Sequence, residues 1–153
     1  MSRVFALRVR LNPRQARTVA AWRYEDARLL LRAGRRQHAN GATYLGGLAL
    51  DCLLKARLLE KHPRLASTSP ETLKGPDRDL WNLIYRGHDL ESALAALPEV
   101  AHTLQSVSST RLDVVLKSIC SRWSVHVRYW PKRIDVSEAE AFLQQVGEVR
   151  EWL

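Results

Sequence analysis

Two pairs of polar residues have the spacing to do chemistry on an anionic substrate. Arg122 and His126 are four residues apart, and so are Asp51 and Lys55, so each pair would share one face of a helix. A histidine can accept a proton near pH 7, and an arginine can stabilise the charge that develops at a phosphorus centre. Arg122 and His126 are therefore candidates for the catalytic pair of a metal-independent ribonuclease. The alternative is a pair of polar groups on the solvated side of a helix.

Asp51 and Lys55 lie within residues 44–59, a segment that is apolar on nearly every side. A helix of this kind occupies the centre of a bundle, where a buried charge must be paired with an opposite one. Two interpretations stay open. The pair either lines a polar cleft that also receives His88, Asp89 or Arg128 and binds nucleic acid or a nucleotide, or it forms a salt bridge that holds the helices in register.

The positive charge of the chain is concentrated at one end. The net charge is +8, and residues 1–36 contain ten arginines against only Glu25 and Asp26, so the rest of the chain is electrically neutral. A helical wheel places five arginines within about a third of the circumference. They are Arg14, Arg17, Arg28, Arg32 and Arg35. Because a solvated face usually mixes both signs, this stripe favours an RNA, nucleotide or acidic protein partner.

Other kinds of site are not indicated by the residue spacing. The histidines and cysteines are scattered without the pattern of metal ligands, and no glycine-rich phosphate loop occurs, so we expect neither a metal nor a cofactor. Cys52 and Cys120 are expected to be free thiols in a reducing compartment. The chain shows neither a secretory signal nor a membrane span, so we expect a cytoplasmic protein with no membrane partner. The arginine-rich start leaves organelle targeting as an alternative.

The elements that must position these residues are helices. Asn12 and Pro13 mark the start of a helix that Gly34 ends, and later segments repeat the helical periodicity. We expect helices at 13–33, 36–61, 79–85, 90–97, 109–127 and from 137, where Ser137 and Glu140 form a capping box, with a loop at 62–77. The predicted fold is an all-α, antiparallel bundle of four to six helices at 13–153. A basic extended arm at 1–12, with a possible short strand, precedes it.

The large aromatic residues are expected to pack mainly in the core. Trp22, Trp81, Trp123 and Trp152 fall at positions compatible with burial, and Trp130, beside Pro131, is the one expected to be free. The adjacent glycines at 46 and 47 lie inside a predicted helix. They are expected to let a neighbouring element approach that helix closely.

An ordered series of short motifs resembles the HEPN family. Residues 42–56, ATYLGGLALDCLLKA, resemble the family's helix with a tyrosine–leucine followed by an acid–cysteine–x–leucine–lysine–alanine motif. His88-Asp89-Leu90 is similar to a short segment that precedes the family's fourth helix. Trp123 with Arg128 and Tyr129, and a closing helix that ends near Trp152, continue the likeness. The resemblance extends over residues 22–153. Asp51 stands where the family usually has glutamate, and the gap between Arg122 and His126 is shorter than in the ribonuclease members.

The resemblance to the HEPN family implies a helical bundle that forms a homodimer. It further implies binding of RNA or a nucleotide, or association with a nucleotidyltransferase-like partner protein. The candidate binding residues are the five stripe arginines with Asp51, Lys55, His88 and Arg128. One alternative is a metal-independent, toxin-type ribonuclease that uses Arg122 and His126. Another is a non-enzymatic dimerisation or scaffold subunit.

Overall fold

The protein folds as an all-α bundle, as the sequence predicts. The computed structural model describes residues 10–107 and 111–153, and these contain seven α-helices and no strand. The α-helices are α1 (Pro13–Arg32), α2 (Ala39–Lys61), α3 (Gly75–Tyr85), α4 (Leu90–Ala95), α5 (Pro98–Val107), α6 (Leu112–Arg122) and α7 (Val136–Arg150). Short 3-10 helices connect them: η2 (Arg36–His38), η3 (Pro63–Ala66), η4 (Pro70–Thr72) and η5 (Val125–Tyr129). Most of the predicted basic arm lies outside the described residues.

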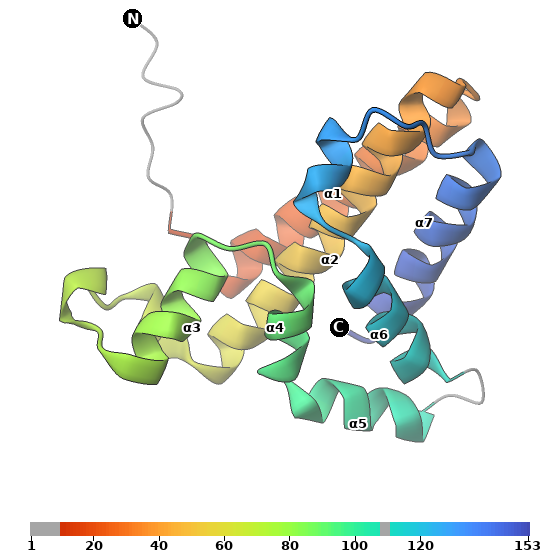
Figure 1. Cartoon of the computed structure of the whole chain (residues 1–153). Coiled ribbons are helices and arrows are strands. Elements are labelled where there is room, and N and C mark those ends of the chain that lie inside the picture. The colour runs from red at the N-terminus through yellow and green to blue at the C-terminus, as the bar shows by residue number, and fades with distance from the viewer. Residues whose placement is uncertain (1–9, 108–110) are drawn as a thin grey trace, which may run out of the picture.

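Helix α2 is the centre of the bundle. Helices α1, α4 and α7 and the 3-10 helix η5 all pack against it, and Figure 1 shows α1 and α2 side by side along their length. The α1 side of this contact is a row of buried alanines, Ala16, Ala20 and Ala27, whose small side chains allow close packing. Among the helices described, none is long and apolar enough to cross a membrane.

The first helix begins and ends as its sequence predicts. The side-chain oxygen of Asn12 accepts a hydrogen bond from the Gln15 backbone N–H at 2.9 Å, and the Gln15 side chain accepts one from the Asn12 N–H at 3.2 Å. This reciprocal arrangement is a capping box. Gly34 follows the helix with a φ of +64°, a conformation in which glycine is not strained.

The described residues contain seven helices where four to six were expected, because α5 was not predicted. Four boundaries also differ from the prediction. Helix α3 begins at Gly75, inside the loop expected at 62–77, and not at residue 79. Pro98 was expected to stop a helix, but it is the first residue of α5, where a missing N–H breaks no hydrogen bond. The helix expected at 109–127 ends at Arg122, because Trp123 is extended and the Ser124 side chain caps η5 instead. The last helix starts at Val136 after Asp135, so Ser137 and Glu140 do not form its capping box.

The two glycines inside α2 provide the close approach that the sequence predicts. A Cβ added at Gly47 would overlap the indole ring of Trp123, and one at Gly46 would lie 3.0 Å from Leu143 Cδ1 on α7. Trp123 and Trp81 are buried, as expected, and Trp130 is exposed. The other two predictions are wrong: Trp22 is 60% exposed and Trp152 is 42% exposed.

Candidate functional site

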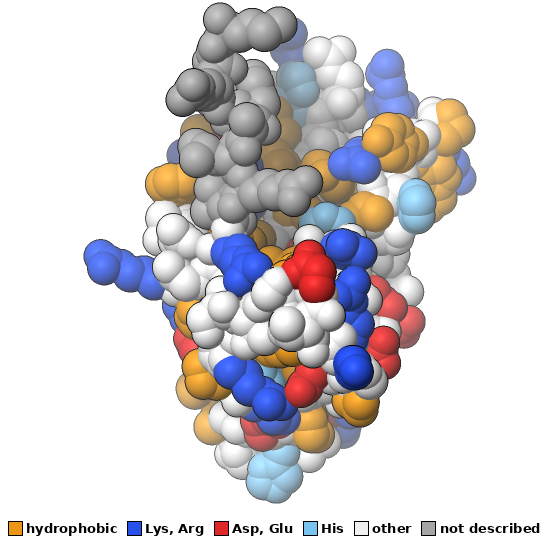
Figure 2. Space-filling view, turned by 90° about the vertical axis from the view of Figure 1, so that its left-hand side faces the viewer, with side chains coloured by type: hydrophobic (Ala, Val, Ile, Leu, Met, Phe, Trp, Pro, Cys, Tyr) orange, Lys and Arg blue, Asp and Glu red, His pale blue; other side chains and the backbone are white. Residues whose placement is uncertain are grey.

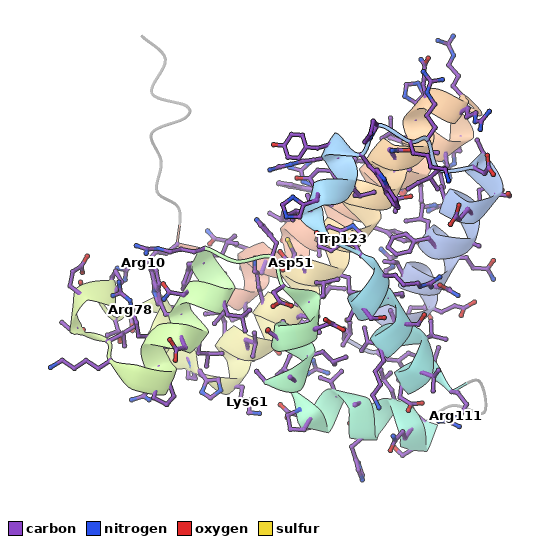
Figure 3. The ribbon with its side chains drawn as sticks, viewed as in Figure 1. Arg10, Asp51, Lys61, Arg78, Arg111 and Trp123 are labelled. Atoms are coloured by element: carbon purple, nitrogen blue, oxygen red, sulfur yellow. The ribbon has the colours of Figure 1, made fainter. Side chains whose placement is uncertain are left out.

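Three polar residues predicted as candidates meet at the middle of α2. The Asp51 carboxylate Oδ2 lies 2.8 Å from Lys55 Nζ and 2.8 Å from His88 Nδ1. Lys55 Nζ also donates to the Gly87 carbonyl oxygen at 2.7 Å and lies 3.4 Å from His88 Nδ1. We call Asp51, Lys55, Gly87 and His88 the Asp51 cluster, and Figure 3 labels Asp51 at its place on α2.

The Asp51 cluster has a buried and an exposed part. The side chains of Asp51 and Lys55 are 2% and 6% exposed, whereas that of His88 is 46% exposed. Asp51 Oδ1 has no hydrogen-bond partner within residues 10–107 and 111–153. Asp51 and Lys55 therefore form the buried salt bridge of the second interpretation. The pair is an internal salt bridge that ties α2 to the segment before α4, and it supports an imidazole that reaches the surface.

Arg128 does not join the Asp51 cluster. Its guanidinium donates to the Tyr44 hydroxyl at 3.1 Å and lies 4.6 Å from the centre of the Tyr129 ring, a cation–π distance. Tyr44 is seven residues before Asp51, so the two residues share a face of α2 and lie about 10 Å apart along its axis.

A cavity of about 850 Å³ lies between α2, η5, the segment 130–134 and α7. We call it the basic-aromatic cavity, because cations and aromatic rings share its wall. Its basic residues are Arg122, His126, Lys132 and Arg133, and its aromatic residues are Trp123, Tyr129, Trp130 and Phe142. The volume is within the range of small-molecule sites, and the only acidic lining residue is Glu138. The cavity has the chemistry to hold a planar base together with a phosphate.

Arg122 and His126 both line this cavity but not as predicted. Because α6 ends at Arg122, the two residues do not share a face of one helix. Arg122 Nη2 donates to Gln145 Oε1 on α7 at 3.1 Å, and its Nε donates to the Ser118 carbonyl oxygen. The chain turn at Trp123, not helical spacing, brings both side chains to the cavity.

The predicted arginine stripe is partly neutralised, and only four of its five members lie on α1, because α1 ends at Arg32 and Arg35 follows Gly34. Arg17 forms an ion pair with Glu60 at 2.8 Å, and Arg28 forms one with Glu25 at 3.2 Å. For Arg14, Arg32 and Arg35, no ion pair occurs with any residue that the structure describes. Four of the five arginines are exposed, as predicted, whereas Arg17 is half-buried. The three that form no ion pair among the described residues make a weaker anion site than five would.

Sequence reasoning missed the residues that give the basic-aromatic cavity its character. The sequence predicts Trp130 to be free, but it assigns no binding role to its neighbours Tyr129, Lys132 and Arg133. The signal was present in residues 128–133, RYWPKR, where basic residues flank two aromatic residues and a proline. Aromatic and basic residues grouped in this way are typical of surfaces that bind single-stranded nucleic acid.

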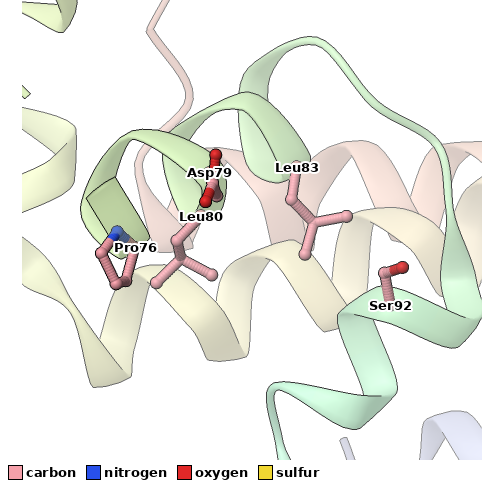
Figure 4. A pocket seen from close by; sticks show the side chains of 5 residues that line it. All are labelled: Pro76, Asp79, Leu80, Leu83 and Ser92. Carbon is pink, nitrogen blue, oxygen red and sulfur yellow. The ribbon is translucent and has the colours of Figure 1, made fainter. Parts of the chain in front are cut away.

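A second, smaller cavity lies between α3 and α4. It has a volume of about 540 Å³ and is lined by Pro76, Leu80 and Leu83 with Asp79 and Ser92 (Figure 4). Figure 2 shows the end of the molecule formed by α3, where Lys and Arg side chains are mixed with Asp and Glu. The residues that line this apolar groove include an aspartate and no lysine or arginine, so it is a poor site for an anion.

No family model, no curated protein and no solved structure matches the chain. Within residues 10–107 and 111–153, no group of three or more His, Cys, Asp or Glu side chains could hold a metal ion. The function is therefore inferred from the geometry of the basic-aromatic cavity and of the Asp51 cluster.

Proposed function

We propose that this protein binds unpaired RNA nucleotides in the basic-aromatic cavity. The observation that carries the proposal is that an exposed tryptophan, Trp130, shares one concavity with Arg122, Lys132 and Arg133. An aromatic ring can stack on any base, and stacking contributes about 1–3 kcal/mol per base. Guanidinium and ammonium groups bind phosphate oxygens, which makes affinity depend on salt. RNA is also the ligand class that the resemblance to the HEPN family implies, together with a homodimer.

We propose that the protein acts in a reducing, cytoplasmic compartment. Cys52 and Cys120 are both free thiols, which fits a compartment in which disulfides do not form. The arginines Arg14, Arg32 and Arg35 would extend the phosphate path beyond the cavity if the RNA is longer than a few nucleotides. The nucleotidyltransferase-like partner and the scaffold role are alternatives for a chain that binds no RNA.

The test is fluorescence anisotropy of a labelled 12-nucleotide single-stranded RNA, measured as a function of salt. Trp130→Ala should weaken binding by about 5–100-fold, from the loss of one stacked base. Trp22→Ala is the matched control, because Trp22 is equally exposed, at 60% against 58%, but lies on α1 away from the cavity. A mononucleotide competitor distinguishes a nucleotide within an RNA strand from a free nucleotide as the ligand. Displacement of the RNA by micromolar mononucleotide identifies the free nucleotide as the ligand. Undetectable RNA binding at low salt, or equal losses in both variants, would contradict the proposal.

A ribonuclease activity with Arg122 and His126 as the catalytic pair is the second candidate. One observation favours it: both side chains line the basic-aromatic cavity, where a bound phosphodiester would lie. His126→Ala should then abolish cleavage of RNA while leaving its binding measurable. Intact RNA after incubation with the wild-type protein would contradict this candidate.

A further inference from the structure

We infer that the basic-aromatic cavity selects guanine among the four RNA bases, and that Glu138 makes this selection. The inference rests on the proposed function and deepens it, because it names the base that the cavity accepts. The carboxylate of Glu138 contacts the edge of the base, while the cations that line the same cavity contact phosphate.

Glu138 is an exception among the polar residues of the cavity. It is the only acid on a wall that also carries Arg122, Lys132 and Arg133. Its side chain is exposed, and its carboxylate forms no ion pair with any residue in the ranges 10–107 and 111–153. A carboxylate repels phosphate, so Glu138 would weaken the site if it faced that part of a nucleotide. Its place in the cavity therefore favours a contact with a part of the ligand that presents hydrogens.

An ionised carboxylate can only accept hydrogen bonds, and this property distinguishes the four bases. The Watson–Crick edge of guanine presents two neighbouring donors, N1–H and the N2 amino group, which match the two carboxylate oxygens in a pair of parallel hydrogen bonds. Adenine and cytosine each present one amino donor beside an acceptor nitrogen, and uracil presents one N–H between two carbonyl oxygens. These three bases therefore place an acceptor against the carboxylate, which is a repulsive contact.

The order of side chains along α7 resembles the order of groups in a nucleotide. Glu138 and Gln145 are seven positions apart, so they share a face of the helix and lie about 10 Å apart along its axis. Ala141 and Phe142 line the cavity between them. Arg122 Nη2 donates to Gln145 Oε1 at 3.1 Å, which leaves the Gln145 amide N–H groups and Arg122 Nη1 to donate to a phosphate. A phosphate at this end and a base edge at Glu138 place the rest of the nucleotide over the apolar residues.

The wall formed by the segment 130–134 is held in position before any ligand binds. The side-chain nitrogen of Asn40, on α2, donates to the carbonyl oxygens of Lys132 at 3.0 Å and Trp130 at 3.4 Å. The Ile134 N–H donates to the side-chain oxygen of Asn40 at 2.8 Å. One side chain therefore fixes this backbone at three points. A base that stacks on the exposed Trp130 ring then has a defined position relative to α7, which selection by one carboxylate requires.

The experiment measures the affinity of the full chain for four labelled RNA strands by fluorescence anisotropy. Each strand consists of 12 uridines, either unchanged or with guanine, adenine or cytosine at one central position. The guanine strand should bind about 10–100-fold more tightly than each of the others, which is the discrimination expected from one bidentate contact to a base edge.

Glu138→Gln should abolish this preference, because an amide presents one acceptor and one donor where the carboxylate presents two acceptors. The affinity of the variant for the all-uridine strand should stay the same or rise, because a negative charge near the phosphates is removed. Glu140→Gln is the matched control. It makes the same change of charge at an exposed position of α7 that does not line the cavity, so it should keep the preference for guanine.

Equal affinities of the wild type for the four strands would overturn the inference and leave the proposed function standing, whereas undetectable binding of all four would overturn both. A guanine preference that Glu138→Gln retains, or that both variants lose equally, would also overturn the inference. Competition with guanosine and adenosine monophosphates distinguishes the two sources of the base. Stronger displacement by the guanosine compound supports the inference for a free nucleotide, and displacement by neither supports it for a guanine within an RNA strand. Stronger displacement by the adenosine compound overturns it.

Discussion

Lys55 Nζ lies 2.8 Å from Asp51 Oδ2, and the two side chains form an ion pair that is almost completely buried in the bundle. They are four positions apart on α2, so the helix itself brings them together. Their burial depends on other parts of the chain, since the Gly87 carbonyl oxygen and His88 Nδ1 complete the surroundings of the ammonium. The pair therefore links the central helix to a segment more than thirty residues away in sequence.

Lys55→Met should lower the free energy of unfolding by about 3–5 kcal/mol, because it leaves the buried Asp51 carboxylate without its cation. The measurement is chemical denaturation at pH 7. Arg23→Ala is the matched control, since it breaks an exposed pair with Asp26 on α1. That variant should lose less than about 1 kcal/mol. Equal losses in the two variants would show that the buried pair has no special role in stability.

Gly47→Ala should destabilise the protein by about 1–3 kcal/mol, because the added methyl group overlaps the Trp123 ring. The ring is held where it is by its own hydrogen bond, in which Trp123 Nε1 donates to the Thr43 carbonyl oxygen at 3.1 Å. Gly41→Ala is the control in the same helix, where the new methyl group meets only the end of the Leu30 side chain. A thermal melt of both variants measures the difference. A Gly47→Ala variant as stable as Gly41→Ala would refute the close approach.

Asp89→Ala should lower the free energy of unfolding by about 1 kcal/mol at pH 7, since Asp89 caps α4. Its carboxylate accepts hydrogen bonds from the Ser92 hydroxyl and backbone N–H, and these hold the pKa of Asp89 below its ordinary value. A carboxyl whose pKa is lowered by folding stabilises the protein above its unfolded pKa and loses this effect as the pH falls. The difference from wild type should therefore shrink below about pH 4. Asp89→Asn retains a capping acceptor, so a comparable loss in that variant at pH 7 would argue against the cap.

Cys52 and Cys120 should react slowly with thiol reagents in the native protein. Burial raises the pKa of the Cys52 thiol to about 11, with the Asp51 carboxylate adding to it, and burial raises that of Cys120 to about 12. Since the thiolate is the reactive form, Cys52 should react about 100-fold more slowly at pH 8 than in the unfolded chain. The rate of colour release from a disulfide reagent, with and without denaturant, measures this. Equal rates in both conditions would contradict the burial of the thiols.

Lys132→Ala and Arg133→Ala should each reduce the salt dependence of RNA binding. A cation that contacts one phosphate of a single strand contributes about 0.7 to the slope of log affinity against log salt, so each variant should lower the slope by about that amount. Lys74→Ala removes the same charge from the exposed residue before α3 and is the control. A lower slope with Lys74→Ala, or an unchanged slope with both other variants, would place the phosphates elsewhere.

The local signals in the sequence were sufficient for the first two helices. Asn12 with Pro13, Gly34, and the apolar residues 44–59 predict α1, its end and the central α2, because capping, positive φ and uniform apolarity depend on neighbouring residues alone. The pairing of Asp51 with Lys55 was predictable for the same reason. Pro98 shows the limit: a proline is compatible with the end of one helix and the first turn of the next.

The tertiary structure alone decided which residues meet across the bundle. His88 reaches Asp51, Arg128 reaches Tyr44 instead, and the extended residue Trp123 turns the chain so that Arg122 and His126 face one cavity. Burial of Trp22 could not be judged from its helical position, because α1 packs through its small alanines and leaves that tryptophan outside. These outcomes depend on how whole helices pack against one another. Side-chain periodicity says which face of a helix is apolar, but the volume and shape of the partner determine what that face contacts.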